Sequence, residues 1–203
     1  MEKDFISFIN KQKYRFIMAL SAGLWALIII PVLIVFWLIF SFNRLVSLRN
    51  RAENAWSQID IQLKRRFDLI PNLIETVKGY MKHEKDTLKE VTAARTQFLN
   101  AQGPVGKAKA DNMLTDALKT IFSVAESYPK LEANTNFIQL QEELTGTENK
   151  IAYSRQYYND TVESFNTKLQ TFPTNLIGKM LGFIKKEFFE TAESERAPVK
   201  VKF

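Results

Sequence analysis

The feature that most constrains this chain is an almost unbroken apolar run from Phe16 to Phe42, FIMALSAGLWALIIIPVLIVFWLIFSF, which contains no charged residue. A helix needs only about 20 apolar residues to cross the hydrocarbon core of a bilayer. A buried helix of a water-soluble domain keeps one polar face, and this run has none. A cleaved signal peptide has a shorter apolar core and a cleavage site with small residues, whereas Asn43 and Arg44 follow here. The run therefore predicts a transmembrane helix over residues 16–42.

The rest of the composition indicates one helical domain tethered to that membrane helix. The chain has 203 residues, and removing the span and its N-terminal flank leaves roughly 160, enough for one ordinary domain. Charged residues make up 25% of the chain and there are only 7 glycines and 6 prolines, which favours helices over a β-rich or disordered chain. We divide the chain into an N-terminal tail (1–15), the transmembrane helix (16–42), a helical bundle (43–185) and a C-terminal tail (186–203).

Cysteine and histidine usage excludes several kinds of site. The chain has no cysteine, which excludes disulfides, thiol catalysis and cysteine-based metal sites. The one histidine, His83, lies among charged residues that would not orient it, so we predict a surface residue. The glycine-rich, metalloprotease and nucleophile-elbow motifs of common enzymes are missing from the sequence. We therefore expect no catalytic residue, no cofactor, no metal and no small-molecule substrate.

Positive charge flanks the apolar run, in a chain of formal net charge +6. Such flanks face anionic lipid headgroups, and without a binding motif they do not indicate nucleic-acid binding. Four basic residues close to the run precede it and three follow it: Lys3, Lys11, Lys13 and Arg15, then Arg44, Arg49 and Arg51. The positive-inside rule then leans slightly towards a cytoplasmic N-terminus, while the more distant Lys64-Arg65-Arg66 run favours the opposite orientation. The side of the membrane that carries the bundle stays open.

Apolar and small residues recur after the span at alternating steps of three and four. They are Leu45, Leu48, Ala52, Ala55, Ile59, Leu63, Phe67, Ile70, Ile74, Val77 and Met81, followed less regularly by Leu88, Val91, Ala94 and Phe98. This spacing predicts a helix that packs against another helix at a shallow angle. No glycine or proline separates Phe42 from Leu45, which allows the membrane helix to continue directly into this one. Pro71 predicts a kink or a short break near residues 67–71, because proline lacks the amide donor.

Two further helices and a short amphipathic segment complete the predicted fold. A second helix is expected at about 107–127, ending before Pro129, and a third from about Asn134 to Phe172, ending before Pro173. The apolar seam of the third helix consists of Phe137, Leu140, Leu144, Glu148, Ile151, Arg155, Tyr158, Val162, Phe165, Leu169 and Phe172. The predicted fold class is all-α, with the transmembrane helix continuing into an antiparallel bundle of three long helices plus a short C-terminal amphipathic helix.

Two charged residues, Glu148 and Arg155, fall on the apolar seam of the third helix. Because a buried charge is unfavourable unless it is paired, Arg155 is hypothesised to meet a carboxylate of the first helix. The candidate carboxylates are Asp60, Asp68 and Glu75. The equal alternative is that Arg155 extends its guanidinium group to water. A polar stripe lies beside the seam, and we interpret it as a solvated face in preference to a binding surface; it consists of Ala152, Gln156, Asn159, Glu163, Asn166 and Gln170.

Three stretches carry a distinctive order of motifs. They are LRNRAENAWSQIDIQLKRRFDLIPNLIETVKGYMKHEKDTLKEVTAAR at 48–95, YPKLEANTNFIQLQEELTGTENKIAYSRQYYND at 128–160 and VESFNTKLQTFP at 162–173. With this order and spacing, roughly residues 43–203 resemble the bacterial LemA family. The resemblance implies a single-pass membrane protein with an antiparallel helical bundle, no enzymatic activity and no cofactor, and a bundle on the cytoplasmic side. Matching motif positions, interpreted first as structural residues that set a kink or fix helix register and second as a shared binding surface, are Asp68, Pro71, Asn72, Glu75, Tyr128, Pro129, Asn134, Glu148, Asn149, Arg155 and Asn159.

The sequence therefore predicts a membrane-anchored helical scaffold in the bacterial cytoplasmic (inner) membrane, which associates with itself or organises other membrane proteins without catalysis. The alternative is a lipid-binding or membrane-remodelling module, in which the basic residues beside the span and the amphipathic segment around 175–189 lie on a bilayer. Some relatives of the family that the chain resembles are associated with organising internal bacterial membranes. An enzyme that uses the polar stripe is the least favoured reading. The expected partners are membrane lipid and other copies of the chain or other membrane proteins, with neither nucleic acid nor a small-molecule substrate among them.

Overall fold

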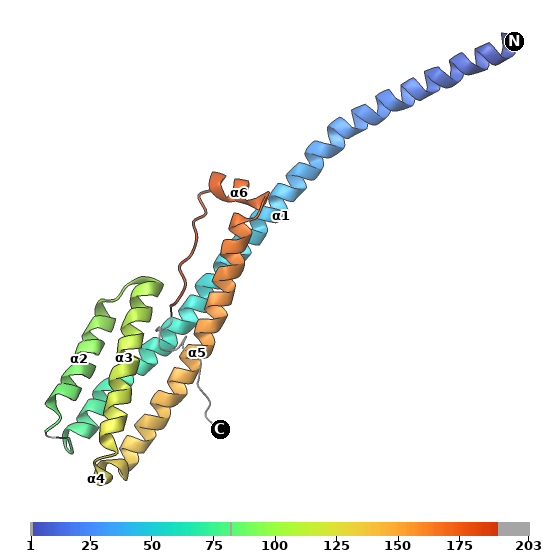
Figure 1. The fold of residues 1–203 in the computed structure, drawn as a ribbon. Coiled ribbons are helices and arrows are strands. Elements are labelled where there is room, and N and C mark those ends of the chain that lie inside the picture. Colours follow the sequence, from blue (N-terminus) through green and yellow to red (C-terminus); the bar gives the residue numbers. More distant parts are fainter. Residues whose placement is uncertain (1, 82, 191–203) are drawn as a thin grey trace, which may run out of the picture.

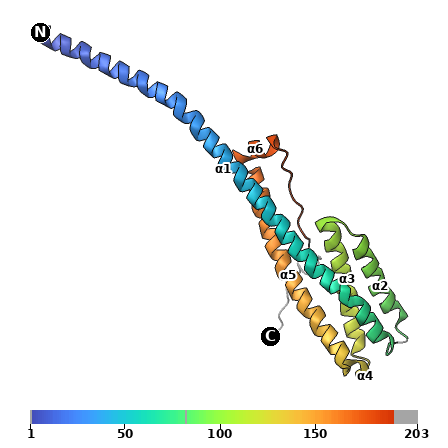
Figure 2. The ribbon, with the colours of Figure 1, turned by 180° about the vertical axis from the view of Figure 1, so that it is seen from behind.

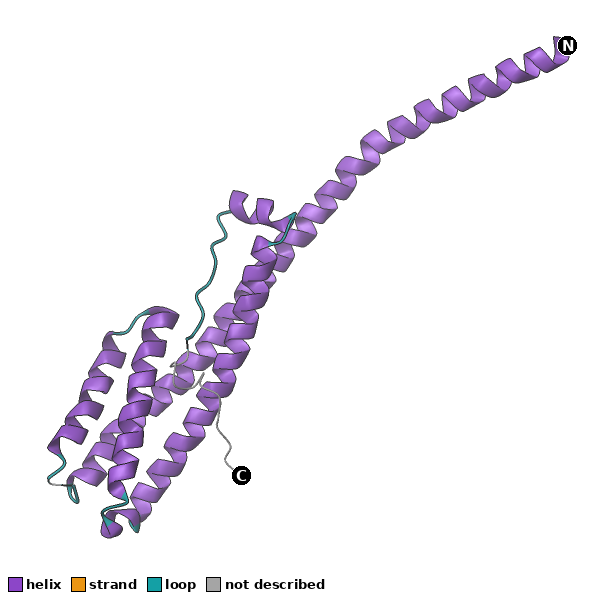
Figure 3. Ribbon diagram, in the orientation of Figure 1, coloured by secondary structure: helices purple, strands orange, loops and turns teal. Residues whose placement is uncertain are grey.

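The structure is a computed structural model that describes residues 2–81 and 83–190, and this part of the chain is helical without strands (Figure 3). The helices are α1 (Glu2–Lys78), α2 (Lys85–Asn100), α3 (Gly103–Ala125), α4 (Pro129–Glu132), α5 (Thr135–Gln170) and α6 (Thr174–Met180). The all-α prediction, with a long N-terminal apolar helix that packs against other helices, is confirmed.

α1 is a single helix of 77 residues that leaves the bundle and extends far beyond it (Figures 1 and 2). Between Leu27 and Phe40 every side chain except the half-buried Trp37 is exposed. Burial begins at Ser41 and Leu45, which are 2% and 0% exposed, so the apolar run ends where packing starts. The apolar run thus continues directly into the bundle within one helix, and residues 2–15, predicted as a tail, belong to the same helix.

The bundle is built on an antiparallel pair, in which α5 packs along the part of α1 that follows the apolar run (Figures 1 and 2). α2 and α3 form a hairpin over the end distant from that run. The predicted α1 positions from Leu45 to Ile70 that recur at steps of three and four are buried. After Pro71 the predicted positions Val77 and Met81 are also buried, but Leu73, 0% exposed, takes the place predicted for Ile74, which is only half-buried. α1 continues through Pro71 without the break that the sequence allowed.

The chain reverses direction after Lys78, although the regular spacing of apolar residues in the sequence continues past this point. Its apolar residues at 88–98 therefore belong to a separate helix, α2, and the bundle has four long helical segments where three were predicted. α3 starts earlier than the predicted residue 107, because Pro104 is well suited to the first helical turn and Gly103 adopts a φ of 69°. Phe172, predicted on the seam, is 76% exposed because α5 ends at Gln170.

Packing extends beyond the predicted boundary of the bundle at residue 185. The chain after α6 returns along the bundle as an extended segment (Figure 1), and Phe189 is 0% exposed. We call residues 183–190 the strap. Residues 191–203 of the predicted C-terminal tail lie outside the described residues.

Candidate functional site

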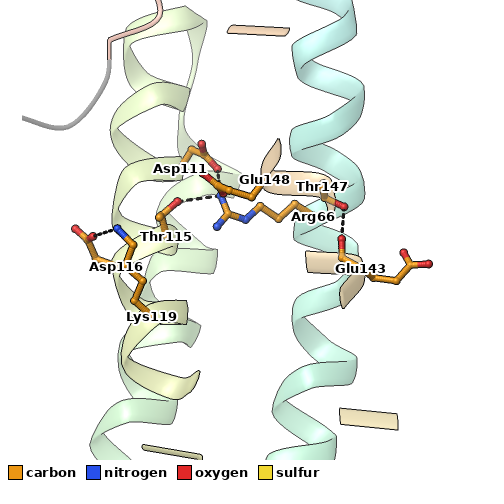
Figure 4. A network of polar contacts seen from close by, with 8 residues as sticks. All are labelled: Arg66, Asp111, Thr115, Asp116, Lys119, Glu143, Thr147 and Glu148. Atoms are coloured by element: carbon orange, nitrogen blue, oxygen red, sulfur yellow. Dashed lines mark hydrogen bonds and ion pairs between the residues drawn. The ribbon is translucent and has the colours of Figure 1, made fainter. Parts of the chain in front are cut away.

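A buried polar cluster joins α1, α3 and α5 (Figure 4). Arg66 of α1 donates through Nη1 to Asp111 Oδ1 and to Thr115 Oγ1 of α3, each at 2.9 Å. The same nitrogen forms an ion pair with Glu148 Oε2 of α5. The side chains of Arg66 and Asp111 are only 4% and 3% exposed, so water screens their pairing weakly. The cluster therefore holds α1, α3 and α5 at one relative register.

The Arg66 guanidinium meets two carboxylates in this cluster, Asp111 and Glu148. Burial raises the pKa of Asp111 from 3.8 to about 6, the positive charge of Arg66 opposes that rise, and the negative charge of Glu148 adds to it. Arg155 of α5 also lowers the pKa of Asp111, more weakly than Arg66 does. Burial is the largest of these effects, so the folded chain favours the protonated form of Asp111 more than the unfolded chain does.

The predicted site residues lie in different surroundings in the structure. Glu148 is in the cluster, paired with Arg66. Asp60, one of the carboxylates considered for Arg155, forms an ion pair with Lys107 of α3. Asp68, Pro71 and Glu75 are exposed on α1, so these family-motif positions take no part in the buried cluster.

Arg66 and Asp111 were not singled out from the sequence. Arg66 belongs to the Lys64-Arg65-Arg66 run, which suggested a solvated, membrane-facing charge. Its spacing carried the missing signal: it lies three residues after Leu63 and four before Ile70, both of which are buried. Asp111 likewise lies three residues before the buried Leu114.

Two asparagines of α5 hold the strap through paired backbone hydrogen bonds. Asn166 Nδ2 donates to the Lys186 carbonyl at 2.9 Å, and Asn166 Oδ1 accepts from the Lys186 amide at 2.9 Å. Asn159 repeats the arrangement with Phe189, at 3.0 and 2.9 Å. Seven helical residues rise about 10.5 Å, and three extended residues span about 10 Å, so the two spacings match.

Side chains complete the attachment of the strap. Tyr158 donates its hydroxyl to the Glu187 carbonyl at 2.8 Å. Burial, with a smaller contribution from the charge of Glu187, raises the pKa of Tyr158 to about 12. The Phe189 ring packs 6.2 Å from Trp56, and Lys186 Nζ lies 3.2 Å from Glu53 Oε1.

The interpretation of the polar stripe as a solvated face is therefore wrong in part. Gln156, Glu163 and Gln170 are exposed as expected. Asn166 is 7% exposed and Asn159 is half-buried, because both bind the strap. Asn159 is among the predicted structural residues, and its contact is with the C-terminal segment.

An open groove of about 760 Å³ runs between α1 and α5. Leu69 and Leu140 contribute apolar surface, and Arg65 pairs with Glu143 across the groove at 3.0 Å. Glu143 points away from α3 (Figure 4), so this groove and the buried cluster lie on different sides of the α1–α5 pair. The remaining lining residues are mostly polar: Asn72, Thr76, Asn136, Gln139, Glu142, Gly146, Thr147 and Lys150.

Two further features bear on chemistry and location. No group of three or more His, Asp or Glu side chains able to hold a metal ion occurs among the residues that the structure describes. His83 is exposed, as predicted.

Within the described part of the chain, one helix, α1, is long and apolar enough to cross a membrane.

Comparison with known proteins identifies similar chains. The model of the LemA family matches residues 55–203. The Protein LemA of Metamycoplasma hominis is 30% identical over 77% of this chain and 72% of its own length. The magnetosome protein MamQ 2 of Paramagnetospirillum magneticum is 22% identical, and the magnetosome protein MamQ of Magnetospirillum gryphiswaldense is 21% identical. Each of these two matches covers 80% of this chain and 69% of the relative.

Proposed function

Because this chain belongs to the LemA family, we propose that it is a membrane-anchored helical scaffold, which acts by contact and not by catalysis. The proposal places α1 in the bacterial cytoplasmic (inner) membrane as a single span. The exposed apolar residues 27–40 support this placement, and so does the similarity to proteins named for the magnetosome.

The observation that carries the proposal is the continuity of α1 between the apolar run and the bundle. At 1.5 Å per residue, the part of α1 from residue 43 to residue 78 extends about 50 Å. A helix held by α5 along this length transmits the position of the anchor to the bundle. Such a rod presents a rigid surface at a set distance from the bilayer, as a scaffold requires.

The α1–α5 groove supports self-association as the form of contact. It carries both signs of charge, with Arg65 and Lys150 near Glu142 and Glu143. A surface that is charged in both senses can complement itself about a two-fold axis, the commonest symmetry of soluble oligomers. We propose that the groove of one copy packs on the groove of another.

Gly146 offers a test, because a Cβ atom added there meets no other atom within 4 Å. Gly146→Trp therefore fills the groove without disturbing the fold. Full-length protein would be extracted with its native lipid in polymer-bounded discs, and the particle mass would be measured by mass photometry. The unmodified chain is expected as a defined oligomer, and Gly146→Trp as a smaller species.

The matched control is Gln156→Trp, at an exposed α5 position outside the groove, which should leave the mass unchanged. An unmodified chain that is monomeric in its own lipid would overturn the self-associating scaffold. If Gly146→Trp kept the full oligomer, the groove would not be the contact.

A further inference from the structure

The short helix α6 and its flanks expose large apolar side chains that the fold does not cover. Met180 and Ile184 are 84% and 81% exposed, and Phe172 is 76% exposed. Leu176 and Leu181 are each 53% exposed. Water-facing surfaces rarely gather such residues in so short a segment without a partner.

This apolar surface lies beside the apolar run of α1. α6 is at the end of the bundle from which α1 emerges, away from the α2–α3 hairpin (Figures 1 and 2). A hollow of about 360 Å³ between the two helices is lined only by apolar side chains: Leu38, Ile39 and Phe42 of the run, and Ile177, Met180 and Leu181. The surface is therefore continuous with the last turns of the membrane helix.

Packing fixes α6 at this level. The Phe183 ring lies 6.3 Å from the rings of both Phe42 and Phe165, and the Arg49 guanidinium is 5.6 Å from its centroid. Gly178 is buried against Leu169, where a Cβ atom would clash. The exposed residues of α6 are thus held in place by neighbours on the opposite side of the segment.

The charges around α6 are positive. Lys179 and Lys185 are exposed and line a second hollow of about 410 Å³, and Arg44 and Arg51 are exposed on α1. No acidic residue occurs between Glu163 and Glu187. Apolar side chains rimmed by lysine and arginine are typical of segments that lie in the interface of an anionic bilayer.

We infer that residues 172–185 form a second membrane contact, with apolar side chains inserted between acyl chains and Lys179 and Lys185 at anionic headgroups. The ligand is the leaflet from which α1 emerges, since the surface continues the apolar run. The inference rests on the proposed membrane anchor. Two contacts, α1 and α6, would fix the tilt of the bundle, which one span alone leaves free.

The chain has no cysteine, so single cysteines can be labelled without other changes. Full-length Met180→Cys would carry an environment-sensitive fluorophore in vesicles of phosphatidylcholine and phosphatidylglycerol with lipid-attached quenchers. Leu33→Cys in the apolar run and Tyr153→Cys on the bundle, 61% and 76% exposed, serve as references. The label at 180 is expected to be quenched several-fold more than that at 153, with blue-shifted emission.

Quenching at 33 without quenching at 180 would overturn the inference and leave the anchor intact. No quenching at 33 would remove the anchor, and the inference with it. A label at 180 that is shielded from water but not quenched by lipid would show that a second copy covers the surface, which also overturns the inference.

The headgroup contact has its own variant. Lys179→Glu with Lys185→Glu should reduce quenching at 180 several-fold in vesicles with phosphatidylglycerol, and less in phosphatidylcholine alone. The control is Lys89→Glu with Lys119→Glu, two exposed lysines on α2 and α3. Equal effects of the two pairs, or no effect of either, would contradict recognition of anionic headgroups.

Discussion

Arg66 Nη1 of α1 lies 2.9 Å from Asp111 Oδ1 of α3, with both side chains almost wholly buried. The two residues are far apart in sequence and on helices that would otherwise meet through apolar side chains. An apolar interface tolerates sliding, whereas a buried pair has one favourable alignment. We interpret the pair as the element that fixes the register of the hairpin on α1.

Removing Arg66 should destabilise the bundle strongly. Arg66→Met removes the guanidinium that contacts both Asp111 and Glu148, and breaking a buried pair in this way decreases the free energy of unfolding by about 3–5 kcal/mol. Arg65→Met is the matched control, because its ion pair with Glu143 is half exposed, and an effect within about 1 kcal/mol is expected. Denaturant unfolding in detergent measures both, and equal effects would contradict a special role for Arg66.

Replacing the whole cluster separates stability from register. Arg66→Met with Asp111→Leu and Glu148→Met removes all three charges that meet in the cluster, so stability should return close to that of the unmodified chain. We expect the α2–α3 hairpin to lose its single alignment on α1, which would appear as line broadening in methyl NMR spectra of the hairpin. A triple variant with sharp, unique resonances would show that apolar packing alone fixes the register.

Asp111 should make stability depend on pH. Its pKa is about 6 in the folded chain and 3.8 ordinarily, so the folded state binds the extra proton between these values. The proton on Asp111 therefore stabilises the folded chain fully below pH 3.8, and this stabilisation is lost as the pH rises to about 6. The melting temperature of the unmodified chain should therefore fall as the pH is raised from 3.8 to about 6. Asp111→Asn should abolish this fall, whereas Asp116→Asn, at an exposed site on α3, should retain it. A fall that persists in Asp111→Asn would assign the proton to another group.

The strap should open more easily when an asparagine is lost. Asn166→Leu removes both bonds to Lys186, which should increase hydrogen exchange at the Phe189 amide by about ten- to a hundredfold. Phe189 is the appropriate probe because its amide is held by Asn159 and not by the altered residue. Gln156→Leu, on the exposed side of α5, should have no effect. Unchanged exchange in Asn166→Leu would show that Phe189 packing alone holds the strap.

Local periodicity explains what could be predicted. The α1 seam from Leu45 to Ile70 follows from steps of three and four, and the span follows from its length and lack of charge. Gly79 is one local sign of the reversal after Lys78, but the apolar residues of α2 continue nearly in phase across a turn that contains no proline. Only the packing of α2 on α3 distinguishes one long helix from two.

The polar contacts were harder to predict because their partners come from distant elements. Glu148 was singled out by its place on an apolar seam, but its partner Arg66 was hidden in a basic run that resembles a membrane flank. The strap has no helical period, and its asparagine partners on α5 resemble a solvated stripe until the returning chain covers them. The Phe188-Phe189 pair in a polar segment was the one local sign of burial.

The central claim, that anchor and bundle share one rigid helix, is tested most directly by a distance. Spin labels at Phe40→Cys and Asp68→Cys, both exposed on α1, would be measured by double electron–electron resonance in lipid nanodiscs. A continuous helix predicts one narrow distribution near about 40 Å. A broad distribution, or one centred well below that distance, would place a hinge between membrane and bundle and contradict the account.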